Sequence, residues 1–238
     1  MAYLIKSQSC LTAWKDACNH ILTNGDGDNL IVEINSPGNF SEAELKEITN
    51  SGLISTTQID NVVNTIFPEK FYRRNLGLTA NQLYDLHEKI YGRGKTMHRK
   101  NKARWGNYFL RFTKFGMSKE NQLQNIINDI NKRKNKYAAC YIMHVSSVQL
   151  DSNTRNIGNP CLQYVQIGQN GNVLNLTAIY RNHDFLNKSL GNYIGLTKLL
   201  GFICTQTGHV MGGLTCHSIH YFLEQKGKVK DCINNLTW

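Results

Sequence analysis

The sequence predicts one α+β domain spanning residues 1–238. Segments with helical periodicity are interspersed with β-branched runs typical of buried strands. An Asn-Gly pair joins two of these runs and predicts a β-hairpin. No repeat and no linker rich in Pro, Ser or Gly divides the chain, so a single domain is the simplest organisation.

The first part of the chain is expected to form several helices and one strand. Ser9–Leu22 reads as an amphipathic helix, and Asn29–Asn35 (NLIVEIN) has the composition of a buried strand. Helices are expected at Ser41–Thr49 and Thr56–Ile66, which have Ser or Thr start signals. Thr79 can cap a further helix through LTANQLYDLHEKIY.

The second part is expected to carry most of the sheet. RWGNYFLRFTKFG is predicted to be extended, Glu120–Lys134 to be a helix, and YAACYIMHVSSV to be a strong strand. The runs CLQYVQIG and VLNLTAIY form the two arms of the hairpin. A long helix is expected over Leu186–Thr207, then a strand over Val210–Ile219 and a short basic tail.

Composition excludes several classes of protein. Hydrophobic residues make up 41% and charged residues 18% of the 238 residues, as in a soluble globular protein, and no apolar run or signal sequence indicates a membrane or an export route. We therefore expect a cytoplasmic protein with no membrane contact. Seven cysteines without a CxxC pair predict neither a disulfide framework nor a zinc site, so no metal is expected.

The net charge of +10 favours an anionic partner. The densest basic run, Arg93–Arg104, is interpreted either as a nucleic-acid arm or as a solvated loop, and the loop is favoured. Because few aromatic side chains interrupt this run, it does not predict a stacking platform for single strands. Nucleic acid is therefore the least favoured of the anionic partners.

The candidate chemistry lies at the outer ends of the hairpin. Cys161 follows Asn159-Pro160 at the start of one strand, and Arg181 follows the other strand. Strands of similar length joined by a tight turn place these ends side by side, so Arg181 should lie near Cys161 and lower the pKa of its thiol. Asp184 then flanks the sulfur. An inert buried Cys161, with Asp184 serving as a helix cap, is the alternative interpretation.

The order of motifs from Asn159 to His217 resembles the core of thymidylate synthase and the related pyrimidine-nucleotide hydroxymethylases. The matching elements are Pro160-Cys161, the hairpin, Arg181-Asn182-His183-Asp184, Gly191-Asn192 and Leu214-Thr215-Cys216-His217. RWGNYFLR resembles the Tyr-Gly-x-x-Trp-Arg stretch of this family. The resemblance covers residues 104–220, between a divergent part at 1–103 and a short tail at 221–238, and it implies a mixed central sheet flanked by helices.

The resemblance also implies roles for individual residues. Cys161 would add to C6 of a pyrimidine ring and make C5 nucleophilic toward a one-carbon unit. Asp184 would contact a folate cofactor or support proton transfer. The implied nucleotide contacts are Arg181 at the phosphate, Asn192 at a uracil-type base edge, His217 at the sugar, and Lys136 reaching across a homodimer. Asn182, which replaces the family's serine, is a further nucleotide-binding candidate.

These expectations predict a C5 methyl- or hydroxymethyltransferase acting on a pyrimidine nucleoside monophosphate with 5,10-methylenetetrahydrofolate. Family members pair their sheets back to back, so a homodimer is implied. Several pocket positions differ from the family, including Leu162, Tyr180 and Ile219. A non-catalytic nucleotide-binding or interaction protein with the same fold is therefore the alternative. His183 and His220 have no counterpart in the family pattern and are interpreted as structural.

Overall fold

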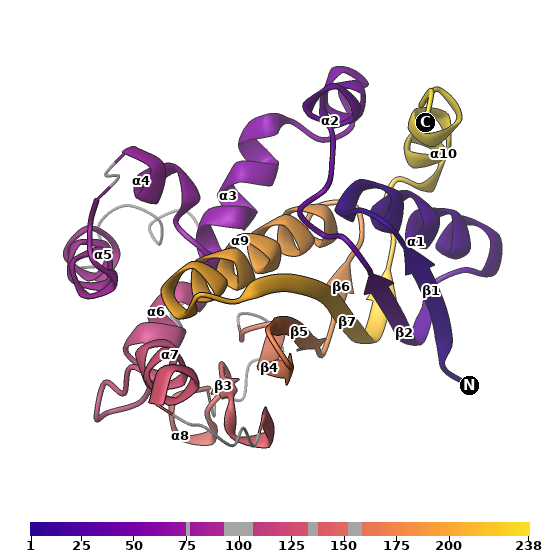
Figure 1. Ribbon diagram of the computed structural model, residues 1–238. Helices are drawn as coiled ribbons and strands as arrows, with labels where there is room; N and C mark the ends of the chain where they lie inside the picture. Colours follow the sequence, from indigo (N-terminus) through magenta and orange to yellow (C-terminus); the bar gives the residue numbers. More distant parts are fainter. Residues whose placement is uncertain (75–76, 93–106, 133–137, 152–158) are drawn as a thin grey trace.

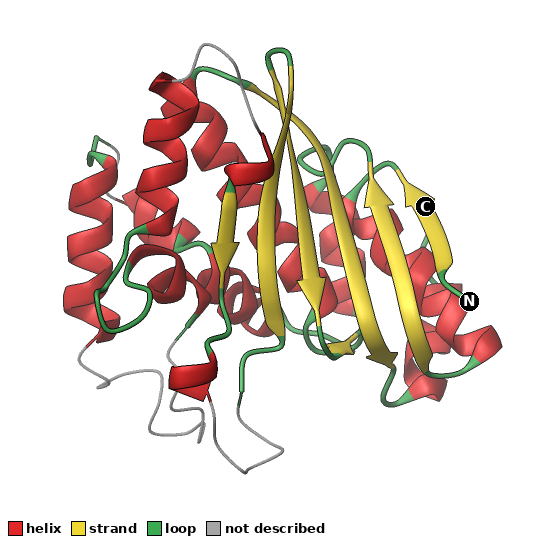
Figure 2. Ribbon diagram, turned by 90° about the horizontal axis from the view of Figure 1, so that it is seen from below, coloured by secondary structure: helices red, strands yellow, loops and turns green. Residues whose placement is uncertain are grey.

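A mixed seven-stranded β-sheet organises the chain, and helices pack against one of its faces (Figures 1 and 2). The computed structural model describes residues 1–74, 77–92, 107–132, 138–151 and 159–238. The predicted α+β class with a mixed, helix-flanked central sheet is confirmed. The basic run Arg93–Arg104 and Lys136 lie outside the described residues.

The strands follow the order β1-β2-β7-β5-β4-β3, and the short β6 pairs with β7. β1 pairs with β2, and β5 and β6 pair with β7, in parallel, whereas the pairs β2–β7, β4–β5 and β3–β4 are antiparallel. Their bounds are β1 Tyr3–Ser7, β2 Gly27–Ile34, β3 Ile142–His144, β4 Leu162–Asn170, β5 Val173–Tyr180, β6 His183–Asp184 and β7 Val210–Phe222.

Alternate residues of each strand separate the two faces of the sheet. The helix-covered face holds fully buried side chains such as Val32, Ala178 and Cys216. The opposite face carries Ile31, Thr177 and His217, which are partly or fully exposed. Figure 2 shows this second face toward the viewer with the main helices behind it.

Four helices over the sheet begin after a capping Ser or Thr, and the caps at Ser41 and Thr79 agree with the predicted start signals. α1 (Cys10–Asn24) starts after Ser9, α2 (Glu42–Asn50) after Ser41, α3 (Thr56–Ile66) after Ser55 and α5 (Ala80–His87) after Thr79, each with a reciprocal capping box. α5 continues as a π-helical turn, η1 (Glu88–Gly92), and α4 (Glu69–Arg74) precedes it. The predicted helices of this region are therefore confirmed.

The long predicted helix, α9 (Ser189–Thr207), lies between the sheet and α3 (Figure 1). Most of its side chains are buried, because it has packing partners on more than one side. The predicted hairpin is also confirmed: Gly171 occupies the left-handed region, with φ of 57°, in the turn between β4 and β5.

Three local predictions are wrong. Most of the described part of RWGNYFLRFTKFG is helical, as α6 (Tyr108–Thr113). Asn107 caps this helix by accepting from Leu110 N–H, and Phe109 and Phe112 bury one of its faces. YAACYIMHVSSV contributes a 3-10 turn, η2 (Ala138–Cys140), and only the three-residue β3. The predicted tail forms α10 (Lys226–Asn234), whose Val229, Cys232 and Ile233 are buried at helical spacing.

Two further helices complete the described elements: α7 (Gln122–Lys132), as predicted, and α8 (Val148–Asp151). Asp151 of α8 forms a buried bidentate ion pair with Arg111 of α6, at 2.7 Å and 3.2 Å. This pair fixes α8 against α6, and Arg111 also donates to Val145 O just after β3.

The residues after α10 fold back onto α1 and α2. Thr237 donates its N–H and hydroxyl to the two oxygens of Glu47, and Lys15 donates to the Trp238 carbonyl and lies over its ring.

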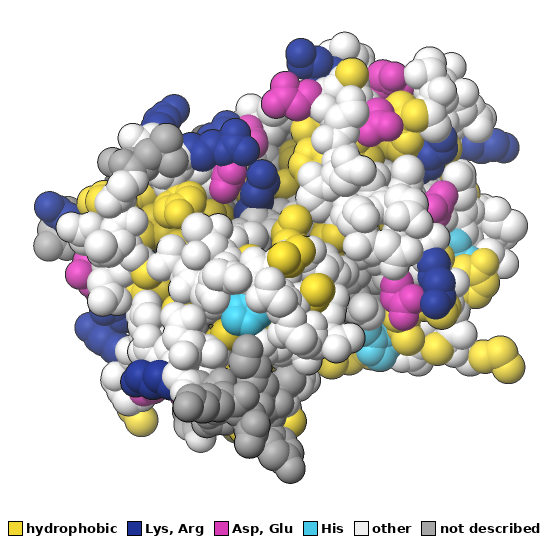
Figure 3. All heavy atoms as spheres, in the orientation of Figure 1, with side chains coloured by type: hydrophobic (Ala, Val, Ile, Leu, Met, Phe, Trp, Pro, Cys, Tyr) yellow, Lys and Arg dark blue, Asp and Glu magenta, His cyan; other side chains and the backbone are white. Residues whose placement is uncertain are grey.

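No helix of the described part combines the length and hydropathy needed to cross a membrane. Lys and Arg side chains lie at separate places on the face in Figure 3, with acidic side chains between them.

Candidate functional site

The two outer ends of the β4–β5 hairpin meet at Cys161 and Arg181. Leu162 pairs with Tyr180 at the ends of the strands, and Arg181 N–H donates to Cys161 O at 2.9 Å. The predicted proximity of these residues is confirmed. It follows from the tight turn, which pairs the two arms in register so that their outer ends lie side by side.

The Arg181 guanidinium holds the segment that precedes the thiol. Its Nε donates to Pro160 O at 3.1 Å and its Nη2 donates to Asn159 O at 3.3 Å. Nη1 donates to none of the described residues, and the side chain is exposed. Arg181 therefore fixes the backbone that precedes Cys161, and it keeps N–H groups available for an anion such as a phosphate.

The Cys161 thiol is half-buried, and burial raises its pKa. The positive charges of Arg181 and Lys188 oppose this shift, and the Asp184 carboxylate adds to it. As expected, the positive charge of Arg181 lowers the pKa of the Cys161 thiol. The overall pKa shift is nevertheless upward, because burial outweighs this charge. The resting thiol is protonated at neutral pH, so a nucleophilic role requires a proton acceptor.

Tyr108 is a site residue that the sequence did not indicate. Its hydroxyl accepts a hydrogen bond from Leu162 N–H at 3.3 Å, directly beside Cys161. The contact is not expected from the sequence, because the segment around Tyr108 is predicted to be extended and is in fact helical. The signal was Asn107 followed by Phe109 and Phe112, which is the pattern of a capped helix with one apolar face.

Asp184 organises the turn that leads into α9. Its Oδ1 accepts from Leu186 N–H at 3.0 Å and Asn187 N–H at 2.9 Å, and its Oδ2 accepts from Asn187 Nδ2 at 3.0 Å. The capping interpretation thus has direct support, although Asp184 caps the turn and not α9 itself, which begins at Ser189. Its charge nevertheless reaches Cys161.

Asn192 lies on the first turn of α9, buried beside His183. Its Nδ2 is 3.0 Å from His183 Nε2, and His183 Nδ1 is 2.8 Å from Ser218 Oγ of β7. His183 is fully buried and stacks on Tyr180 with ring centroids 4.2 Å apart. Burial lowers the pKa of His183 to about 3, so the ring is neutral.

The remaining predicted residues are less closely associated. Asn182 is partly buried, and its Oδ1 is enclosed without a hydrogen-bond donor from the described part of the chain. His217 lies on the open face of the sheet, where its Nε2 is 3.1 Å from Asn29 Oδ1. No described contact links His217 to Cys161, Arg181 or Asn192.

The described residues hold no cluster of three or more His, Cys, Asp or Glu side chains with the arrangement of a metal site. Cys216 and His217 point to opposite faces of β7, and His220 Nδ1 is 2.9 Å from Asp28 Oδ1. Their proximity in sequence therefore does not become a ligand set.

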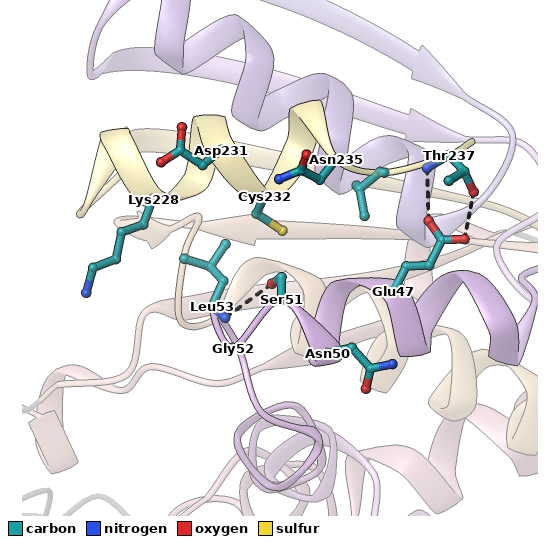
Figure 4. Close-up of a pocket in the computed structure, with 11 residues that line it drawn as sticks. Glu47, Asn50, Ser51, Gly52, Leu53, Lys228, Asp231, Cys232, Asn235 and Thr237 are labelled. Atoms are coloured by element: carbon teal, nitrogen blue, oxygen red, sulfur yellow. Dashed lines mark hydrogen bonds between the residues drawn. The ribbon is translucent and has the colours of Figure 1, made fainter.

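A cleft of about 840 Å³ lies between α2 and α10 (Figure 4). Glu47, Asn50, Lys228 and Asp231 line it, and Glu47 is engaged by Thr237. None of the residues that the sequence singled out belongs to its lining.

With this geometry described, the chain can be compared with known proteins. No model of a known protein family matches the sequence, and no curated protein matches it significantly. The class of the protein therefore rests on its own residues.

Proposed function

We propose that the chain is a thymidylate synthase-like enzyme that attacks C6 of a pyrimidine nucleoside monophosphate and activates C5 for one-carbon transfer. The observation that carries the proposal is the hairpin that places Cys161 against Arg181. Asn192, on the first turn of α9, is linked to this hairpin through His183, which stacks on Tyr180. Thiol, phosphate-binding cation and base-reading amide are the three functions that this chemistry needs.

In the proposed reaction, Cys161 loses its proton to a base and its sulfur bonds to C6. The electrons of the C5–C6 double bond move toward C5 and O4, which makes C5 nucleophilic. Arg181 binds the phosphate through its remaining N–H groups, and Asn192 contacts the base edge. C5 then takes a proton from solvent, and loss of a proton from C5 expels the Cys161 thiolate and restores the double bond.

The one-carbon donor remains a prediction of the resemblance. Asp184 is the residue implied for folate, and its two oxygens already accept three hydrogen bonds from the turn. The proposed chemistry therefore ends at the activated nucleotide, and no step depends on 5,10-methylenetetrahydrofolate.

Exchange of the C5 hydrogen tests this chemistry without any donor. Reversible addition of Cys161 to C6 lets C5 take a proton from solvent, so the protein should replace H5 of dUMP or UMP with deuterium in D₂O. Loss of the H5 signal in proton NMR measures the rate, and Cys161→Ala should abolish it while retaining nucleotide binding. Nucleotide binding without exchange in the unaltered protein would contradict the proposal.

A non-catalytic nucleotide-binding protein is the second candidate. The raised pKa of Cys161 and the engaged carboxylate of Asp184 favour it, because neither group is ready for chemistry in the resting state. This candidate predicts thermal stabilisation by nucleotide that is the same in Cys161→Ala, with no H5 exchange in either protein.

We also propose that two copies pair through the open face of the sheet. Cross-strand registers align one row of residues over this face: Leu4, Ile31, His217, Ile179, Tyr164 and His144. Thr177 lies exposed beside this row. Thr177→Arg should shift the mass measured by light scattering from dimer to monomer. Met117→Arg, at a loop position that is 89% exposed, should not.

A further inference from the structure

Gln163 is the extra residue of a β-bulge just after Cys161, and the proposed chemistry does not use it. Strands β4 and β5 are in register at Leu162 and again from Tyr164, so Gln163 stands unpaired between the two registers. A bulge bends the strand and changes the direction of a side chain, and bulges are frequent beside active sites. Here the bulge turns the Gln163 side chain back toward the residues that precede it.

The side-chain amide of Gln163 bonds to two main-chain carbonyls of the cysteine segment. Its Nε2 donates to Pro160 O at 2.6 Å and lies 3.4 Å from Cys161 O. A carbonyl oxygen can only accept a hydrogen bond, so the amide nitrogen must face these two atoms, because Oε1 in its place would bring three acceptors together. The carbonyl of Gln163 itself accepts from Val145 N–H at 3.0 Å, which anchors the bulge to the residue after β3.

Arg181 holds the same segment from the other arm of the hairpin. Its Nε also donates to Pro160 O, at 3.1 Å, and its main-chain N–H donates to Cys161 O at 2.9 Å. Pro160 O therefore accepts one bond from each arm, as its two lone pairs allow. The two donors differ in charge and exposure, because the guanidinium is charged and exposed, whereas the Gln163 amide is neutral and partly buried. An anion attracts the first donor far more strongly than the second.

We infer that Gln163 is a positioning residue, which holds the Cys161 segment in place when the Arg181 guanidinium turns from Pro160 O to an anion. The inference rests on the proposed function only in identifying this anion as the phosphate of a nucleotide. A hydrogen bond from guanidinium to phosphate is stronger than one to a neutral carbonyl, so the change of partner is favourable for Arg181.

The bond from Gln163 separates anion binding from the position of the thiol. When the guanidinium leaves Pro160 O, Gln163 Nε2 remains bonded to this oxygen, so the segment before Cys161 does not follow the arginine side chain. The main-chain bond from Arg181 to Cys161 O also remains, but it does not reach Pro160 O. Without the Gln163 amide, binding of the anion would release the segment that carries the proposed nucleophile.

The first experiment measures how firmly the segment is held, without any nucleotide. Amide hydrogen exchange is followed by mass spectrometry on peptides that span residues 159–163. In Gln163→Met, which keeps the length of the side chain but not its donor, this segment should exchange about fivefold faster. Gln169→Met removes an amide that bonds to Gly171 O at the far end of β4, and it should leave the segment unchanged.

Inorganic phosphate then separates a positioning role from a merely structural one. In the unaltered protein, phosphate should leave the exchange of the segment unchanged. In Gln163→Met it should speed exchange by about a further fivefold, because Arg181 alone then held Pro160 O. Chloride at the same ionic strength is the control for charge screening. Phosphate that speeds exchange in both proteins, or in neither, overturns the inference.

Replacement of H5 of dUMP by deuterium tests the consequence for the proposed reaction. Gln163→Met should lower the maximal rate about tenfold and leave KM unchanged, because a displaced thiol slows the reaction while Arg181 still binds the phosphate. A loss that appears in KM instead would assign Gln163 to nucleotide binding and contradict the positioning role.

The outcomes separate the inference from the proposed function. If the unaltered protein neither binds dUMP nor exchanges its H5, the proposed function is overturned, and hydrogen exchange with phosphate still decides the inference. Equal exchange of the segment in Gln163→Met and the unaltered protein overturns the inference alone. If Gln163→Met fails to fold, Gln163→Asn takes its place with the same expectations, because its amide is one methylene too short to reach Pro160 O.

Discussion

At the scale of single residues, the reactivity of Cys161 depends on opposing electrostatic effects. Burial raises the pKa of its thiol, and Arg181 and Lys188 lower it. Arg181 cannot be altered cleanly, because it also bonds to the carbonyls of Asn159 and Pro160. Lys188 is exposed, and its effect on the thiol is purely electrostatic.

Lys188→Gln should therefore slow alkylation of Cys161 by iodoacetamide by a few-fold at pH 8. Removing the positive charge raises the thiol pKa further and lowers the thiolate fraction. Peptide mass mapping measures the rate at Cys161, and the exposed Cys140 provides an internal control whose rate stays constant. Equal or faster alkylation of Cys161 would contradict this electrostatic account.

At the scale of elements, the position of α9 depends on its close approach to α3. A Cβ atom on Gly191 would lie 2.6 Å from Val62 Cβ, and one on Gly195 would lie 3.1 Å from Ile66 Cβ. These glycines are four residues apart, so they form one stripe on α9 against α3. Because Asn192 is next to Gly191, this contact also sets the position of the Asn192 side chain.

Gly191→Ala should destabilise the protein by about 2–3 kcal/mol, because the β-branched Val62 cannot move away without shifting α3. Gly201→Ala on the same helix is the matched control, since no atom lies within 4 Å of its Cβ position. This control should instead gain about 0.5–1 kcal/mol from helix propensity. Urea unfolding measures both, and equal stabilities of the two variants would contradict the close packing.

Elements with local signals could be predicted from sequence, and those that depend on distant packing could not. Apolar periodicity predicted α1, and the start signals at Ser41 and Thr79 predicted α2 and α5. The Asn-Gly turn predicted the hairpin and hence the approach of Arg181 to Cys161. No local signal predicts the parallel pairing of β1 with β2, because the paired residues are more than twenty positions apart in the sequence.

The contacts of the candidate site likewise include some that local sequence signals predict and others that depend on the packing of distant elements. The proximity of Cys161 to Arg181 follows from chain geometry and could be predicted. The bonds of His183 to Asn192 and Ser218 join β6, α9 and β7, so they emerge only when these elements pack. The contact of Tyr108 with Leu162 could not be predicted for the same reason, because α6 and β4 are distant in sequence.

At the scale of the whole molecule, one apolar core lies between the sheet and its helices, and it encloses two neutral histidines. Burial lowers the pKa of both His183 and His87 to about 3. The unfolded chain takes up these protons near pH 6.5. Their contribution to stability is therefore complete above pH 6.5 and is lost as the pH falls from 6.5 toward 3.

Between pH 7 and pH 5 each ring should reduce the free energy of unfolding by about 2 kcal/mol. His87 is the better test, because neither of its ring nitrogens has a hydrogen-bond partner in the described structure. His87→Phe should be neutral or stabilising at pH 7 and should remove about 2 kcal/mol of the loss at pH 5. Urea unfolding at both pH values checks this, and an unchanged pH dependence would contradict it.

The central claim is that Cys161 adds to C6 of a pyrimidine nucleotide. Intact mass spectrometry after incubation with 5-fluoro-dUMP, with and without methylenetetrahydrofolate, tests it most directly. The account predicts a mass increase equal to the bound nucleotide, mapped to the peptide with Cys161 and lost in Cys161→Ala. No covalent adduct at Cys161 with any 5-fluoropyrimidine nucleotide would contradict it.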